Sequence, residues 1–149
     1  MRRVKQPSLF SIFIVIVLAF ASATHADAQK KMVLVVNKNV KLEKISKSQV
    51  KDLYLRRLTT FPGMNKKVKP LDQKERVLRE YFYLKTMNYS LRKVNSYWAR
   101  YVFSGKGSPP VKVQGDAAIV ERVTKDDSYI GYISESAMTA DLKIVYRVD

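Results

Sequence analysis

The sequence contains no cysteine, and its only histidine is His25, close to the N-terminus. Without cysteine the chain forms no disulfides, so its stability must come from an apolar core. Beyond His25 there is no imidazole or thiol, which excludes Ser-His-Asp and Cys-His catalytic sites and typical zinc sites. We therefore expect a protein that is not an enzyme and that uses no metal or cofactor.

Acidic residues are also scarce, with 13 Asp and Glu against 28 Lys and Arg, a net charge of +15. Such a charge attracts polyanions or anionic membrane surfaces, although a solvated basic face is the simpler alternative. No basic motif interleaved with aromatic residues of the kind found in single-strand readers is present. Since the chain also carries an export signal, described next, we expect no nucleic-acid partner.

The N-terminal segment has the pattern of a secretory signal peptide. Arg2, Arg3 and Lys5 precede an uncharged apolar run from Leu9 to Phe20, which is short for a membrane span of about 20 residues. A retained membrane anchor is the alternative, and no cysteine follows the run to carry a lipid. Small residues then provide cleavage sites after Ala26 or Ala28. We predict a signal peptide over residues 1–28 and periplasmic localisation.

Residues 29–149 are enough for one domain with one core, and they retain a net charge of about +13. Met32–Asn37 (MVLVVN) is a continuous β-branched run, the pattern of a strand buried on both faces. Val68–Leu71 and Tyr129–Ser134 are further predicted strands, and Gly131 in the latter permits a close backbone approach. Lys143–Val148 alternates, which places Ile144, Tyr146 and Val148 on one face of a half-exposed terminal strand.

Helices are predicted between these strands from caps and apolar periodicity. Ser46 and Gln49 form a capping box, and Ser90 and Asp116 are suitable N-caps for later helices. The residues Gly105–Gly115, with two prolines, are expected to form the main loop. Trp98, the only tryptophan, is expected to be a packing anchor among core aromatics. The predicted helices run from Ser46 to about Leu58, from Lys74 to Thr86, from Ser90 to Val102 and from Asp116 to Val123, with a further short helix near Ser134–Met138.

This alternation predicts an α/β domain, a mixed sheet of about four strands covered by helices. In open α/β sheets, ligands bind beyond the carboxyl ends of strands, near helix N-termini. That rule selects the turns after the first two strands, 37–39 and 72–76.

Several segments together resemble a known family: VVNKNV, then ISKSQVKDLYLRRLTTFPGMNKKVKPLDQ, REYFY, NSYWARYVFSGKG and YIGYIS. They are similar to the periplasmic phosphate-binding protein of ABC transporters, of the type 2 periplasmic-binding-protein superfamily, in a short stand-alone form. The likeness covers residues 33–148. It implies one lobe of a two-lobed, solute-binding protein.

Family members clamp phosphate with a Ser-Gly-Thr helix N-terminus and an Arg/Asp pair. The resemblance aligns Gln73 with the Arg, Glu75 with the Asp, and residues 77–79 with Ser-Gly-Thr. The turn therefore lacks the glycine and hydroxyl groups of the family. Amide and cationic side chains remain there, beside a helix N-terminus. The candidate ligand-binding residues are Asn37, Asp72, Gln73, Lys74, Arg76, Arg79 and Lys106.

Two functions follow as hypotheses. The first is an exported solute-binding protein for phosphate or another small anion, working with an ABC transporter permease. The second is a single-lobe interaction protein that has lost solute binding and docks on an envelope or sensor partner. Either form could associate as a homodimer, and neither is expected to insert stably into the membrane after signal cleavage.

Overall fold

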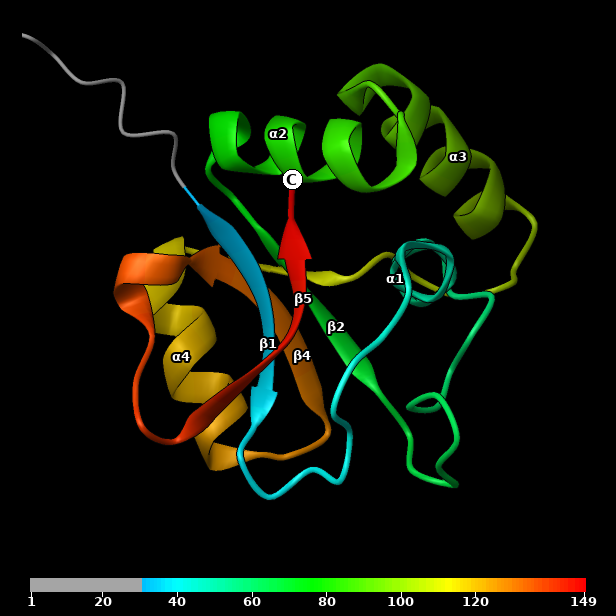
Figure 1. Cartoon of the computed structure of the whole chain (residues 1–149). Coiled ribbons are helices and arrows are strands. Elements are labelled where there is room, and N and C mark those ends of the chain that lie inside the picture. The colour runs from blue at the N-terminus through cyan, green and yellow to red at the C-terminus, as the bar shows by residue number, and fades with distance from the viewer. Residues whose placement is uncertain (1–30) are drawn as a thin grey trace, which may run out of the picture.

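The computed structural model describes residues 31–149 (Figure 1). The predicted signal peptide therefore lies outside the described residues. The remaining chain folds into five strands, four α-helices and one short 3-10 helix. In chain order these are β1 (Met32–Asn37), α1 (Lys47–Tyr54), β2 (Lys69–Gln73), α2 (Arg76–Met87), α3 (Leu91–Phe103), β3 (Val111–Val113), α4 (Gly115–Lys125), β4 (Tyr129–Ser134), η2 (Glu135–Ala137) and β5 (Leu142–Val148).

The strands form one mixed sheet in the order β3-β2-β4-β1-β5. Strand β2 runs parallel to both β3 and β4, whereas β1 runs antiparallel to β4 and β5. The predicted α/β fold class is confirmed, with one strand more than expected. The extra strand is β3, which lies in the stretch predicted as loop, because three residues are too few to show a strand pattern.

Strand β1 is buried on both faces, as its apolar run predicts. Its alternate residues enter two separate cores: Leu34 joins a large cluster with α1, α2 and α3, and Val33 and Val35 join a smaller one with α4. The first three helices therefore cover one face of the sheet and α4 covers the other (Figure 1).

The large cluster is rich in aromatic side chains. Phe82 of α2 stacks on Tyr132 of β4 with ring centroids 3.9 Å apart, and Tyr54 of α1 packs 4.6 Å from Phe82. Trp98 is 5% exposed and packs edge-on against Tyr97 in the same cluster, so its predicted role as a packing anchor is confirmed.

The glycine of β4 also has the predicted role. A Cβ added at Gly131 would lie 2.5 Å from Cγ2 of Ile119, a side chain of α4 that is fully buried. Helix α4 packs closely on the sheet because residue 131 has no side chain.

The terminal strand departs from the predicted alternation. The register of β5 against β1 shifts between Leu34 and Val35, so Val145 is an extra, bulged residue. The bulge puts Val145 and Val148 in the large cluster, while Ile144 packs against the small one. The prediction that Ile144 and Val148 share a face is therefore wrong, because the bulge resets the alternation.

The helix boundaries differ from the predictions at three places. The Ser46–Gln49 capping box is present, but α1 ends at Tyr54, because Arg56 adopts a left-handed conformation with φ of 56° and reverses the chain. Helix α2 begins two residues later than predicted, at Arg76. The N-cap of α4 is Gln114 rather than Asp116, whose carboxylate is used elsewhere, as described below.

Candidate functional site

Two polar residues at the carboxyl end of strand β2, Asp72 and Gln73, have their side chains buried in the interior of the protein. They are 1% and 0% exposed, because β2 lies between β3 and β4 and beneath α2. A buried carboxylate must be satisfied by hydrogen bonds or by an opposite charge. Asp72 has both, and its two oxygens have different partners.

Oδ1 of Asp72 accepts hydrogen bonds from the Tyr132 hydroxyl at 2.5 Å and from the backbone N–H of Gln73 at 2.9 Å. Oδ2 accepts one from Nε of Arg79 at 2.6 Å and one from the Tyr83 hydroxyl at 3.1 Å. Four donors therefore fix the carboxylate.

The Asp72–Arg79 ion pair is almost inaccessible to solvent, with side-chain exposures of 2% and 9%. Burial opposes the charge on Arg79, but the adjacent Asp72 outweighs it and raises the pKa of Arg79. The pair is seven residues apart in sequence and forms because the first turns of α2 lie over the end of β2.

Burial, and then the charge of Asp72, raises the pKa of Tyr132 above its usual range. The pKa of Tyr83 is raised in the same way. Both hydroxyls, protonated at neutral pH like any tyrosine, therefore remain donors to the carboxylate at alkaline pH values at which an exposed tyrosine ionises. This is the protonation state that the network requires.

Gln73 joins a second set of hydrogen bonds. Its Nε2 donates to Oδ1 of Asp116 at 2.7 Å and to the backbone carbonyl of Tyr132 at 3.2 Å. Oδ2 of Asp116 accepts from the Ser134 amide, so this carboxylate ties α4 to β2 and β4 instead of capping the helix. The side chain of Gln73 is thus fixed by the two hydrogen bonds of its Nε2. Its Oε1 is buried and has no hydrogen-bond partner among the described residues.

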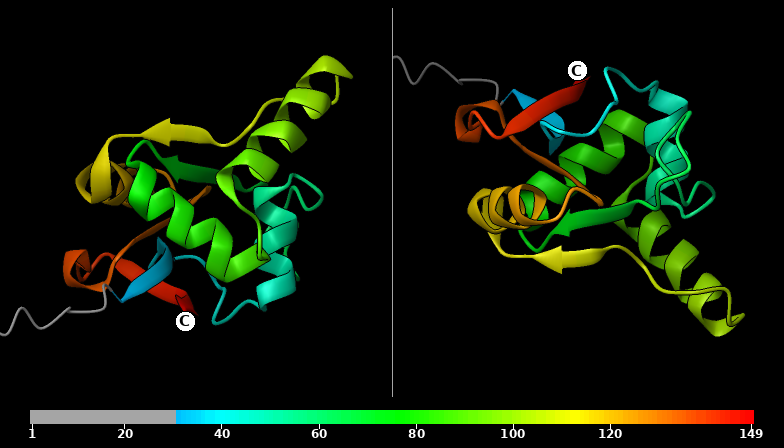
Figure 2. Two further views of the ribbon diagram at one scale, coloured as in Figure 1. Left: turned by 90° about the horizontal axis from the view of Figure 1, so that it is seen from above. Right: turned by 90° about the horizontal axis from the view of Figure 1, so that it is seen from below.

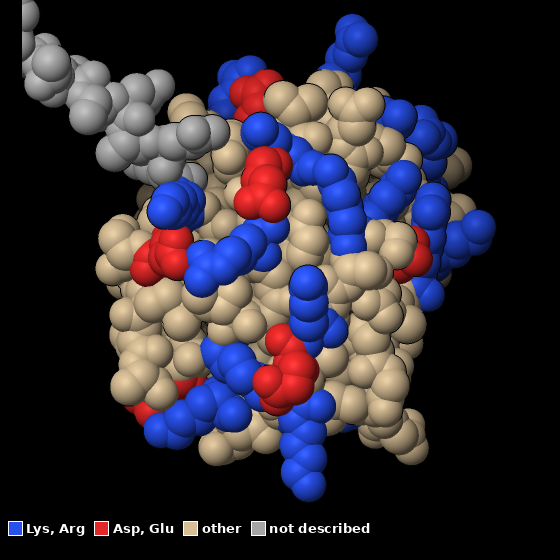
Figure 3. All heavy atoms as spheres, viewed as in Figure 1, with Lys and Arg blue, Asp and Glu red and all other residues tan. Residues whose placement is uncertain are grey.

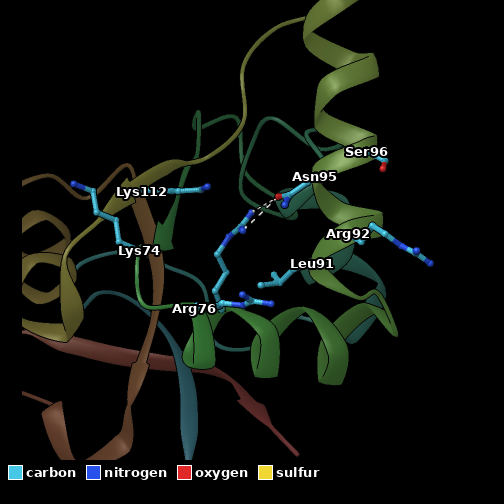
Figure 4. A pocket seen from close by; sticks show the side chains of 8 residues that line it. Lys74, Arg76, Leu91, Arg92, Asn95, Ser96 and Lys112 are labelled. Carbon is cyan, nitrogen blue, oxygen red and sulfur yellow. Dashed lines mark hydrogen bonds between the residues drawn. The ribbon is translucent and has the colours of Figure 1, made fainter.

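The residues that follow Gln73 turn outward and line a cleft of about 510 Å³ between β3, α2 and α3 (Figure 4). In the close view Lys112 and Asn95 extend toward each other across the cleft, whereas Lys74 and Arg92 extend toward its outer sides. The lining side chains are Lys74, Arg76, Arg79, Leu91, Arg92, Asn95, Ser96 and Lys112.

The cleft lining carries five cations and no carboxylate. Arg79 is paired with Asp72, and within residues 31–149 the other four, Lys74, Arg76, Arg92 and Lys112, form no salt bridge. Basic side chains also outnumber acidic ones over the face seen in Figure 3. A cleft with unpaired charges of one sign raises the local concentration of anions.

Arg79 presents a specific geometry to this cleft. Its Nε is held by Asp72, while Nη1 and Nη2 make only long contacts, of 3.5 and 3.4 Å, to Oδ1 of Asn95 (Figure 4). A guanidinium anchored on one edge and open on the other presents two donors in the fork that suits an oxyanion. The nearby first turn of α2 has no side-chain cap on its N–H groups.

The structure does not bring together all the candidate ligand residues. Asn37 lies at the opposite edge of the sheet, because β1 runs antiparallel to β4 and so also to β2. Its Nδ2 donates to the carbonyls of Val123 and Thr124 at the end of α4. Lys106 lines a different hollow, with Tyr97, Arg100, Tyr101 and Ser104.

Sequence reasoning missed the other four polar residues of the cleft: Arg92, Asn95, Ser96 and Lys112. The first three occupy the polar side of α3, where nothing distinguishes a ligand residue from a solvated one. Lys112 belongs to β3, which was predicted as loop. The buried ion pair between Asp72 and Arg79 was not predicted, although both residues were candidates, and Glu75 is the exposed N-cap of α2.

No protein-family model matches the chain, and no curated protein matches it. Several solved structures, in contrast, match the chain in their fold. A protein from Clostridium perfringens, described as a phosphate ABC transporter substrate-binding protein with bound phosphate, matches with a TM-score of 0.62 and 18% identity over 77% of this chain and 44% of its own. An ABC-type phosphate transport receptor from Vibrio cholerae matches with a TM-score of 0.61 and 14% identity, over 77% and 45%.

The fold is similar to part of each of these proteins. PstS from Borrelia burgdorferi shows the same likeness, with a TM-score of 0.56, 11% identity and coverage of 77% and 46%. The matched region is less than half the length of each of these proteins. The resemblance stated from the sequence is thus confirmed at the level of the fold.

Two further findings bear on function. Within residues 31–149 no group of three or more His, Asp or Glu side chains is arranged to hold a metal ion. The same part of the chain contains no helix with the length and hydrophobicity needed to cross a membrane.

Proposed function

We propose that the protein is an exported, phosphate-binding-like solute-binding protein that binds a small oxyanion in the cleft between β3, α2 and α3. The observation that carries this proposal is the state of Arg79. Its Nε is fixed by a buried carboxylate, and its terminal nitrogens face a cleft that four unpaired cations line and no carboxylate enters. The similar solved proteins bind or transport phosphate by their descriptions, which supports the same ligand class.

In this proposal Arg79 forms the floor of the site and gives two directed donors to the anion. Arg76 and Lys112 close over it from α2 and β3 and supply charge. The turn contains no glycine, and the start of α2, Arg76-Val77-Leu78, offers no hydroxyl donors. We therefore expect weaker phosphate binding than a glycine- and hydroxyl-lined cradle gives. The protein would act in the periplasm, beside an ABC transporter permease that receives the anion.

Isothermal titration with phosphate and with sulfate tests the proposal. We expect saturable heat with phosphate in the millimolar range or below, and a severalfold weaker affinity in Lys112→Gln and in Arg76→Gln. Lys47→Gln is the matched control, because it removes one exposed charge on α1, outside the cleft. The proposal fails if the folded wild type gives no heat at millimolar ligand, or if Lys47→Gln weakens binding as much as the cleft variants.

A second candidate function is an interaction module that docks on an envelope partner without binding solute. The observation that favours it is the exposure of large apolar side chains on the helices around the cleft, including Val77 at 71% and Phe103 at 96%. Cross-linking in the periplasm, followed by mass spectrometry, discriminates between the two. A single partner recovered from wild type but not from Val77→Ser, combined with no heat in the titration, would favour docking.

A further inference from the structure

The segment between Glu80 and Asp116 contains no acidic residue at all. It includes most of α2, all of α3 and β3, and the loop between these last two elements. Six cations occupy it: Lys85, Arg92, Lys93, Arg100, Lys106 and Lys112. Positive charge in this segment is therefore not offset by any acidic residue of the segment itself.

Helix α3 carries part of this segment away from the body of the protein. When the molecule is seen from above or from below, the last turns of α3 project beyond the sheet and the other helices (Figure 2). Every residue from Val102 to Pro109 is exposed. Gly105 and Gly107, with φ of 70° and 138°, let the chain reverse at the end of the projection. We call residues 102–107 the α3 tip.

The α3 tip exposes apolar surface at its outermost point. Phe103 is 96% exposed and its neighbour Val102 is 51% exposed, while the core-facing side of the helix is already filled by Trp98 and Tyr101. Phe103 therefore contributes little to the core. Arg100 and Lys106, three residues to either side, flank it with positive charge.

An aromatic end flanked by cations is the composition of an interfacial membrane contact. The ring enters the boundary between headgroups and acyl chains, and the Lys and Arg side chains remain at the level of anionic headgroups. A protein partner could also use exposed apolar side chains. The complete absence of acidic residues from the tip and its two neighbouring elements favours a uniformly anionic surface over a mixed protein surface.

We propose that the α3 tip is a peripheral membrane contact, which places Phe103 in the surface of an anionic lipid leaflet. This contact is separate from the cleft, and it does not depend on the proposed anion-binding function. It is also distinct from stable insertion, since only the end of one helix enters the interface. A contact of this kind would hold the protein against the membrane in which a permease lies.

Vesicle co-sedimentation tests the proposal with a chain that begins at Gln29. Such a chain keeps the whole fold, because all five strands and both hydrophobic clusters lie within residues 31–149. We expect binding to equimolar phosphatidylglycerol and phosphatidylcholine vesicles that weakens with salt, and much less binding to phosphatidylcholine alone. No binding to the anionic vesicles overturns the proposal, and would leave a protein partner as the occupant of the tip.

Two variants locate the contact. Phe103→Ser is expected to lower the partition coefficient about tenfold, and Lys106→Gln about fivefold. Neither side chain packs in the core, so thermal unfolding should be unchanged. Val77→Ser, which removes an exposed apolar side chain of α2, is the matched control and should bind as wild type does. Equal binding by Phe103→Ser and wild type overturns the proposal, because the contact would then lie elsewhere.

A fluorescent variant gives a second readout. Trp98 is the only tryptophan and is buried, so Phe103→Trp adds one probe at the tip. Its emission should shift to the blue on addition of anionic vesicles, while the wild-type emission stays constant. Co-sedimentation without any shift in Phe103→Trp would show electrostatic adsorption only, and would overturn entry of residue 103 into the leaflet.

Discussion

The chain from the end of β2 to the start of α2 has two sides, which differ in burial and in the pairing of their charges. On the inner side, Asp72, Gln73 and Arg79 are buried, and the Asp72–Arg79 ion pair is completed by tyrosine hydroxyls. On the outer side, Lys74 and Arg76 are exposed and form no salt bridge with any described residue. Both sides are polar, yet the inner one should govern stability, whereas the outer one should affect binding alone, with only the terminal nitrogens of Arg79 serving both. Four predictions test this division.

The largest effect is expected for Asp72→Asn, which removes the negative charge and leaves Arg79 buried without a counter-ion. Breaking a buried pair in this way costs about 3–5 kcal/mol of unfolding free energy. Urea unfolding measures it. Asp52→Asn is the control, because Asp52 pairs with Arg57 on the surface at 3.7 Å and should cost less than about 1 kcal/mol. Equal losses in the two variants would contradict the division.

The second prediction concerns alkaline pH. Burial raises the pKa of Tyr54, Tyr83 and Tyr132 in the folded protein, whereas in the unfolded chain they titrate near 10. The folded state therefore holds more protons than the unfolded state above pH 10, so stability is complete below about pH 10 and falls as the pH rises further. Because the unfolded tyrosines lose their protons around pH 10, each one lowers the unfolding free energy by about 1.4 kcal/mol in total between pH 9 and 11. Urea unfolding across this interval should show a loss of stability that Tyr132→Phe reduces by that amount.

At neutral pH the same substitution, Tyr132→Phe, has a smaller effect. It removes the 2.5 Å hydrogen bond to Asp72 but keeps the ring stacked on Phe82. We expect a loss of about 1–2 kcal/mol by urea unfolding. Tyr146→Phe is the control, since the Tyr146 hydroxyl forms no hydrogen bond within residues 31–149. A comparable loss of stability in this control would show that the effect of Tyr132→Phe does not come from the hydrogen bonds to Asp72.

The smallest effect on stability is expected on the outer side of the turn. Replacement of Arg76 by Gln should change the unfolding free energy by less than about 0.5 kcal/mol, because surface charges contribute little. The same variant should weaken phosphate binding in the titration described above. A variant that lost stability and kept its affinity would reverse the assignment of the two sides.

How far the sequence predicts this molecule depends on the range of the interactions concerned. Met32–Asn37 and the Ser46–Gln49 capping box are predicted correctly, because apolar runs and caps are local patterns. Strand β3 and the bulge at Val145 were not predicted, because each exists only through pairing with a neighbouring strand. For the site, the sequence indicated the turn at residues 72–79 but not which of its side chains point inward.

The sequence by itself determined the excess of positive charge, the absence of thiol and imidazole chemistry after His25, and the position of the turn after β2. Only the tertiary structure decided that Asp72 meets Arg79, that Lys112 and Asn95 border the same cleft, and that Asn37 lies at the other edge of the sheet. The physical reason is burial. A carboxylate can stay ionised in the core only if folding brings a cation and hydroxyl donors to it, and those partners come from elements distant in the chain.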